Sequence, residues 1–371
     1  MRGRDRTDSL AQADVLSLGD RLLPWSAAHY DRGMNHEPVG SVNGDEGLLV
    51  LVREARPHLV RTGADAEAWL GRLEEQHDGL HDLMERLLVA DPQAASEAAA
   101  TLWRFWWQRG HMTEGRELLE RAATIEGSDR TQVLRGLGTI AFRQGDVEAA
   151  ERAFLQRLEL VEHDGTQQEL AEAFADLARI ALRRGDFAEV RRYAERGYAA
   201  AEGLGPEAIR GPIHMRAAAA RMEGRLDEAR ALYLESRKLS EGLGNELGVA
   251  GEDHNLVYIA LHSGDREEAG RRFRMSSEWI FANDNAYMRP YVFLDAGILA
   301  LHDGELERAG RLVACAQRIF EDTDSIPDPD DRVELDDAIV RLAAQLGDDF
   351  DAVWSDGRSL SLDEAQTLAR A

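Results

Sequence analysis

The stretch ALRRGDFAEVRRYA, from Ala181 to Ala194, places a Gly-Asp turn between two segments of helical character. Glycine adopts the left-handed conformation that ends a helix without a Cβ clash. An aspartate directly after it can cap the next helix or favour its dipole. The stretch therefore predicts two helices that fold back on each other at Gly185.

The same turn recurs along the chain at spacings of 35, 40, 39, 40 and 40 residues, at Gly110, Gly145, Gly185, Gly224, Gly264 and Gly304. The residue five positions after each glycine is usually small, and alanine stands four positions before each of the last five glycines. Small residues on both sides of a turn let antiparallel helices approach closely. We therefore predict an all-α fold: an α-α superhelix, or solenoid, of about six repeats of 35–40 residues plus capping helices.

The repeated order of small residue, polar-Gly-Asp turn, alanine and aromatic residue resembles the tetratricopeptide repeat, from about residue 94 to residue 321. This resemblance implies that the first helix of each unit lines a concave surface. Three further segments, Trp69 to Met84, Leu102 to Ala122 and Phe350 to Ala369, resemble the C-terminal helical-repeat region of actinobacterial ATPase-containing, LuxR-type transcriptional regulators. The chain has no GxxxxGK[ST] motif, so the resemblance implies their sensory or scaffolding array without the NTPase or DNA-binding domains.

The segments outside the repeats divide the chain further. Residues 1–45 contain scattered Gly and Pro without a sustained period and are expected to form a loosely ordered leader. We expect N-terminal helices at 46–93, the helical-repeat array at 94–324 and C-terminal capping helices at 325–371. The last region begins with the Pro-Asp linker SIPDPDDR.

The composition excludes several function classes. A formal charge of −25 repels phosphate backbones and anionic lipid surfaces, so no direct nucleic-acid or membrane partner is expected. The sequence has a single cysteine, Cys315, and no 18-residue apolar run, which favours a cytoplasmic protein. It contains no catalytic, cofactor or metal-binding motif that we recognise. We therefore expect a protein that is not an enzyme and has no cofactor.

An aromatic cluster begins the array, with Trp103, Phe105, Trp106 and Trp107 in five consecutive positions. The three tryptophans are three and four residues apart and are predicted to share one helical face. Packing between the N-terminal helices and the first repeat is the favoured interpretation. A box that stacks on a ligand is the alternative.

The concave surface is predicted from the residues ten, six and two positions before each glycine from Gly145 onward. These positions carry arginine and histidine but no carboxylate, although the chain as a whole is acidic. Such a stripe favours binding of acidic groups through charge-assisted hydrogen bonds. The candidate binding residues are Arg135, Arg143, Arg179, Arg183, His214, His254, Tyr258, His262 and His302, with Asn255 adjacent.

The leading hypothesis is thus a non-catalytic adaptor or regulatory protein that binds a protein or peptide partner with acidic groups in its concave groove. The alternative is a sensor whose superhelix encloses a small-molecule effector, such as a small anion. An open groove favours the peptide, whereas closure by the aromatic N-terminal junction favours the small molecule.

Overall fold

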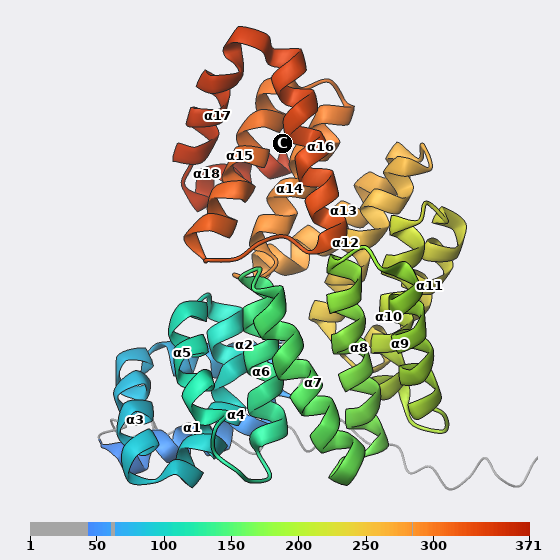
Figure 1. Cartoon of the computed structure of the whole chain (residues 1–371). Helices are drawn as coiled ribbons and strands as arrows, with labels where there is room; N and C mark the ends of the chain where they lie inside the picture. The colour runs from blue at the N-terminus through green and yellow to red at the C-terminus, as the bar shows by residue number, and fades with distance from the viewer. Residues whose placement is uncertain (1–43, 61–63, 284) are drawn as a thin grey trace, which may run out of the picture. The chain divides into compact units, whose positions relative to one another are not determined.

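The computed structural model describes residues 44–60, 64–283 and 285–371 (Figure 1). All regular secondary structure in these residues is helical, which confirms the predicted fold class. The predicted leader, residues 1–45, lies outside the described residues except for its last two positions. None of the described helices is long and apolar enough to cross a membrane.

The described helices follow one another in antiparallel hairpins (Figure 1). Before the repeats come α1 (Asp45–Leu59), α2 (Ala64–Glu74) and α3 (His77–Ala90). The repeats comprise α4 (Pro92–Arg109), α5 (Met112–Ala122), α6 (Arg130–Arg143), α7 (Val147–Asp164), α8 (Gln167–Arg183), α9 (Phe187–Ala200), α10 (Pro206–Met222), α11 (Leu226–Gly242), α12 (Glu246–His262), α13 (Arg266–Ala282), α14 (Arg289–His302) and α15 (Leu306–Asp322). The chain ends with α16 (Pro329–Leu346), the 3-10 turn η2 (Gly347–Asp349), α17 (Phe350–Ser359) and α18 (Leu362–Arg370).

The repeated glycines form the turns inside these hairpins. All six have a left-handed backbone with φ between 71° and 89°, which L-residues with a Cβ rarely adopt. After three of the turns, an aspartate side chain accepts a hydrogen bond from the backbone of the following helix, at Asp146, Asp186 and Asp265. The turn chemistry read from the sequence is therefore present in the structure.

Close packing of small residues holds each hairpin together. Ala141, Ala220 and Ala300, each four residues before a repeated glycine, are at most 1% exposed. A Cβ placed on Gly138 of α6 would lie 2.4 Å from the ring of Phe154 on α7. Because interiors are packed this densely, the hairpins leave no room for larger side chains at their crossings.

The helices after the strict repeats extend the same core. Helices α16, α17 and α18 pack on α14 and α15. Leu335 and Leu342 of α16 and Ala365 of α18 are buried in one apolar cluster with α12 to α15. At the other end, α1, α2 and α3 pack on α4 and α5. Both flanking regions thus cover apolar helix faces, as solenoid ends require.

Candidate ligand-binding cavity

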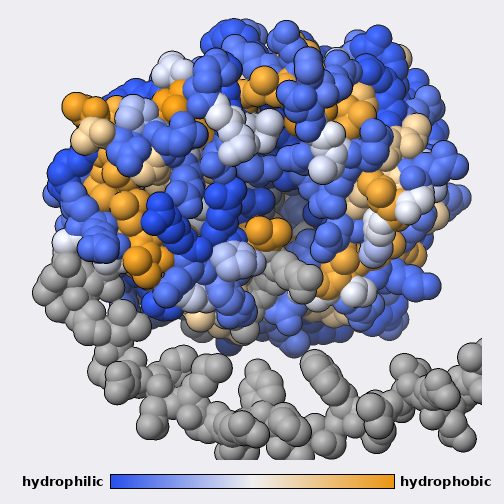
Figure 2. All heavy atoms as spheres, turned by 90° about the horizontal axis from the view of Figure 1, so that it is seen from below, coloured by the Kyte–Doolittle hydropathy of each residue, from blue (hydrophilic) through white to orange (hydrophobic). Residues whose placement is uncertain are grey.

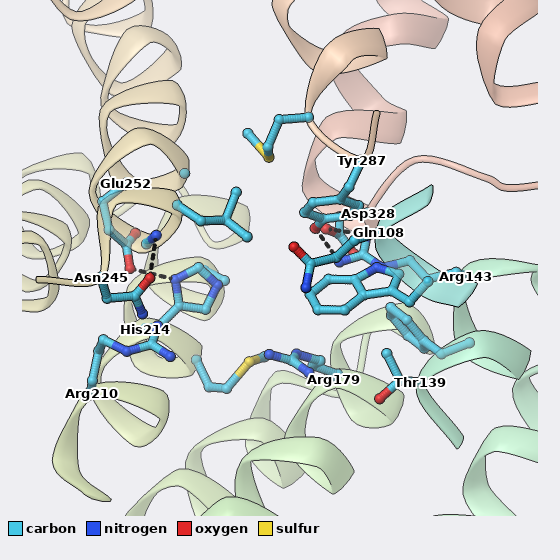
Figure 3. A pocket seen from close by; sticks show the side chains of 18 of the residues that line it. Gln108, Thr139, Arg143, Arg179, Arg210, His214, Asn245, Glu252, Tyr287 and Asp328 are labelled. Atoms are coloured by element: carbon cyan, nitrogen blue, oxygen red, sulfur yellow. Dashed lines mark hydrogen bonds and ion pairs between the residues drawn. The ribbon is translucent and has the colours of Figure 1, made fainter. Parts of the chain in front are cut away.

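A cavity of about 360 Å³ lies between the first helices of the repeats. Its walls come from α4, α6, α8, α10 and α12, with contributions from the end of α1 and the starts of α14 and α16. One face of the molecule is hollowed near its middle, and most of the residues around the hollow are hydrophilic (Figure 2). In the close-up, Arg210, His214 and Glu252 lie across the cavity from Gln108, Arg143 and Tyr287 (Figure 3).

Contacts between the first repeat and the start of α14 close one side of this cavity. The ring of Trp107 lies 4.9 Å from the ring of Tyr287. Arg143 of α6 donates one hydrogen bond to the Tyr287 hydroxyl and another, 3.0 Å long, to the Tyr291 hydroxyl. Trp107 therefore contacts a residue about 180 positions later in the sequence, and Arg143 contacts one that is 148 positions later.

Residues 324–331 cross the concave side, and we call this segment the strap. It consists of the linker after α15 and the first turn of α16. Its backbone is held at both an N–H and a carbonyl: Ile326 N donates to Arg143 O at 2.7 Å, and Arg183 Nη1 donates to Pro327 O at 2.9 Å. The carboxylate of Asp328 accepts from Arg143 at 2.8 Å. The protein's own acidic segment thus binds two of the arginines that we predicted to bind a partner.

A buried cluster of charges anchors the end of the strap. The guanidinium of Arg221 donates to the carboxylates of Asp330 at 3.0 Å, Asp331 at 3.3 Å and Glu334 at 3.1 Å. Burial opposes the charge of Arg221, but the neighbouring carboxylates raise its pKa well above the usual value. Burial and the adjacent Asp331 raise the pKa of Asp330 to about 6. The cluster therefore depends on Arg221, because it contains more carboxylates than cations.

The structure places the ten predicted binding residues in four settings. Six of them line the cavity: Arg135, Arg143, Arg179, His214, His254 and Asn255. Arg183 holds the strap, and Tyr258 is fully buried beneath the Arg221 guanidinium, which lies 4.5 Å from its ring centroid. His262 and His302 lie in a separate pocket of about 220 Å³ beside Glu334 and Arg341.

The prediction that the inner surface has no carboxylate is wrong. The cavity is also lined by Glu172, Glu252, Asp328, Asp330 and Asp331. Glu172 pairs with Arg135 at 2.5 Å, and Glu252 pairs with His214 at 2.9 Å. The projection failed because it sampled only three positions per helix and could not place the strap, which comes from a distant part of the sequence.

Several polar cavity residues are absent from the predicted set, among them Gln108, Arg104 and Arg210. Gln108 and Arg104 stand two and six positions before Gly110, so the same rule applied to the first repeat finds both of them. Arg210 stands one helical turn before His214 and is found when the projection is extended by four residues. A projection that includes the first repeat and one more helical turn therefore identifies all three residues from the sequence.

The aromatic cluster serves both packing and the cavity. Trp106 is 1% exposed and packs against Gly115 of α5, where a Cβ would lie 2.6 Å from the tryptophan side chain. Trp103 and Trp107 stack on each other at 6.0 Å and line the cavity. The prediction of one shared face is therefore wrong for Trp106, which points toward the second helix of its own hairpin.

His254 of α12 joins the strap to α14. Its Nδ1 lies 2.9 Å from Asp295 and its Nε2 lies 3.2 Å from Asp331. Burial opposes its charge, but these two carboxylates raise the pKa of His254 well above its usual value. Because the pKa of His254 is higher in the folded state than in the unfolded state, its charged form stabilises the fold. This stabilisation is fully present below about pH 6.5, the unfolded-state pKa, and is lost as the pH rises through the folded-state pKa.

We therefore expect the stability advantage of the wild type over His254→Gln to fall between pH 6 and pH 8.5. The expected decrease is at least about 1.4 kcal/mol, the linkage energy of one pKa unit. Urea unfolding of both proteins at each pH measures it. A difference that does not change with pH would contradict a charged His254 in the folded state.

Comparisons with known proteins agree with the architecture. A model of the tetratricopeptide-repeat family matches residues 129–203. The chain is similar to a Rap protein solved in complex with competence and sporulation factor, with 15% identity, 88% of each chain covered and a TM-score of 0.55. At this identity the likeness shows the fold, a helical-repeat superhelix, and the family match shows tetratricopeptide repeats within residues 129–203.

Two further solved structures resemble parts of the same arrangement. One is the apo form of RapI, with 11% identity, 87% of this chain and 96% of that chain covered, and a TM-score of 0.45. The other is aspartyl phosphate phosphatase F from Bacillus subtilis, with 10% identity, coverage of 89% and 93%, and a TM-score of 0.43. No protein of curated function matches the chain.

Proposed function

We propose that this protein is a non-catalytic regulator that responds to a small acidic ligand held in its concave cavity. The observation that carries the proposal is the closure of one side of the cavity by the Trp107–Tyr287 contact and the strap. Its volume of about 360 Å³ falls in the range of small-molecule sites, which are concave and have convergent polar groups.

A small-molecule ligand fits this geometry better than a long acidic peptide does. In the described residues, Arg143 and Arg183 already bind Asp328 and Pro327 of the strap. A long peptide that used these arginines would have to displace the strap. A small ligand can instead occupy the cavity beside it, because Asp328 and Asp330 line one wall.

Binding of a protein or peptide partner is the second candidate. The strap itself supports it, because an acidic segment already lies on the concave side with hydrogen bonds to both its backbone and its side chains. The similar Rap protein was solved in complex with competence and sporulation factor. In this second proposal, a partner's acidic segment replaces the strap.

The proposed regulatory role also draws on the resemblance to the repeat regions of LuxR-type regulators, which remains a prediction. We place the protein in the cytoplasm, where its single thiol, the buried Cys315, stays reduced. Ligand occupancy would act on the strap, since the strap contacts both the cavity and the core that holds α16.

Filling the cavity tests the proposed function. Gly251 of α12 lines the cavity, and a Cβ added there meets no atom within 4 Å. Gly251→Trp is therefore expected to occupy the ligand's space while the helix stays intact. We expect the wild type, purified gently from its own organism, to retain a small mass in native mass spectrometry and Gly251→Trp to lose it.

The matched control is Gly242→Trp on α11, where an added Cβ also meets nothing within 4 Å. This position does not line the cavity, so the control is expected to retain the small mass. If the wild type, Gly251→Trp and Gly242→Trp are all found with the same partner protein and without a small mass, the result supports the adaptor function over the sensor function.

A further inference from the structure

The arginines around the cavity are unevenly paired with carboxylates on the side formed by α4, α6, α7, α8 and α10. Five arginines gather there: Arg104, Arg135, Arg157, Arg179 and Arg210. The carboxylates near them are Glu169, Glu172, Asp176, Glu207 and Glu252. Among the described residues, only Glu172 and Asp176 form ion pairs with these arginines. The arginines therefore outnumber the carboxylates that pair with them.

Two of the arginines take up most of the available carboxylate oxygens. Arg157 is fully buried and pairs with Asp176 at 2.9 Å and with Glu172 at 3.2 Å. Arg135 pairs with Glu172 at 2.5 Å. Arg179 is left with one longer contact, 3.4 Å to Asp176, and 39% of its side chain is exposed. The Glu172–Asp176 pair therefore leaves Arg179 only weakly neutralised.

Arg104 and Arg210 have no carboxylate within ion-pair distance among the described residues. The guanidinium carbon of Arg104 lies 4.3 Å from the centroid of the Trp103 ring. Burial, together with repulsion by Arg135, lowers the pKa of Arg104 to about 9. Burial also lowers the pKa of Arg210, and Arg179 and Arg135 add repulsion. Both arginines are half-buried, and Glu172 and Glu252 favour their charge only from beyond ion-pair distance. Partly buried cations without an ion-pair partner are costly unless an anion joins them.

The wall next to Arg104 suits an apolar or aromatic group. Trp103 and Trp107 stack there, and the indole N–H of each is buried with no hydrogen-bond partner among the described residues. Buried donors normally find an acceptor. In Figure 3, Arg179 and Arg210 lie along the same side of the cavity, below His214.

We propose that Arg104, Arg179 and Arg210 form an anion subsite for a ligand that carries two negative charges, as a phosphate monoester or a dicarboxylate, attached to an aromatic or apolar body. The proposal rests on the proposed function, and it specifies which part of the cavity recognises which part of the ligand. The excess of arginine supplies the counter-charge, and the two tryptophans supply the surface for the body.

Binding of defined probes tests this subsite. We would titrate the full chain by calorimetry with phenyl phosphate, phthalate and neutral phenol. We expect at least one dianionic probe to bind at least about 10-fold more tightly than phenol. Arg104→Gln and Arg210→Gln should each lower the affinity for that probe by about 10- to 100-fold, the usual effect of losing a hydrogen bond between charged groups. The preferred probe distinguishes a phosphate from a dicarboxylate.

Two controls separate recognition from folding. Arg216→Gln lies on α10 like Arg210 but does not line the cavity, and it should leave the affinity unchanged. Thermal unfolding should show that Arg104→Gln and Arg210→Gln are at least as stable as the wild type, because each removes an unpaired cation. A purely structural role for these arginines would instead lower stability.

The outcomes distinguish this inference from the proposed function. Equal binding of charged and neutral probes, abolished by Gly251→Trp, would overturn the anion subsite and leave the ligand cavity in place. If neither dianionic probe binds at millimolar concentration, the subsite is also overturned. The proposed function is then tested separately by whether the wild type retains a small mass in native mass spectrometry. If Arg216→Gln weakened binding of the dianionic probe as much as Arg104→Gln and Arg210→Gln do, the effect would come from the net charge of the protein. That result would also overturn the subsite.

Discussion

Arg221→Met is expected to lower the free energy of unfolding by about 3–5 kcal/mol, the range for removing one partner of a buried ion pair. Only 2% of the Arg221 side chain is exposed, and its guanidinium contacts three carboxylates. Methionine preserves much of the apolar volume but leaves Asp330 and Asp331 buried without their main counter-charge. The loss should detach the strap from the concave side.

Urea unfolding followed by circular dichroism measures this effect. The control is Arg225→Met, which removes an arginine that is paired with Glu223 and Glu228 at the surface and should cost no more than about 1 kcal/mol. The deficit of Arg221→Met should be smaller at pH 5 than at pH 7.5. Burial raises the pKa of Asp330, so protonation at low pH removes part of the unpaired charge. Equal losses in the two variants would contradict the anchoring role of Arg221.

Gly357→Ala is expected to cost about 3 kcal/mol, the upper end of the range for overpacking. A Cβ on Gly357 would lie 2.4 Å from the carbonyl oxygen of Arg311 and 2.6 Å from its Cα. These are backbone atoms of α15, so no side-chain rotation relieves the clash. Helix α17 would have to move away from α15 and open the C-terminal end of the core.

The matched comparison is Gly71→Ala in α2, where the added Cβ meets nothing within 4 Å. That substitution should stabilise the protein by roughly 0.5–1 kcal/mol, because alanine is the better helix former. Thermal unfolding of the two variants should therefore shift in opposite directions. Similar shifts would mean that the packing of α17 on α15 does not limit stability.

Much of the fold could be predicted from the sequence because the determinants of the repeats are local. A left-handed glycine, a following Asp and an alanine four residues earlier all act within one hairpin, as Gly185, Asp186 and Ala181 do. Repetition makes such local signals visible without knowledge of any distant contact. The helical hairpins and the order of the repeats followed directly.

The candidate site could be predicted only in part, since several of its features depend on contacts between distant residues. Arg143 was expected to face the cavity, but its partner Asp328 lies 185 residues away and could not be inferred from spacing. The Trp107–Tyr287 contact that closes the cavity is of the same kind. Arg104, in contrast, was within reach of the rule that found Arg179, because it stands six residues before Gly110 as Arg179 stands six residues before Gly185.

The most direct test of the central claim is a crystal structure of the full chain purified from its own organism without removal of small molecules. We expect density for a compact molecule inside the cavity, with its acidic group at Arg104 or Arg210 and its body against Trp103 and Trp107, and with the strap still held by Arg221. A strap displaced from Arg143 and Arg183 by a segment of another protein, with no small molecule in the cavity, would contradict the sensor function.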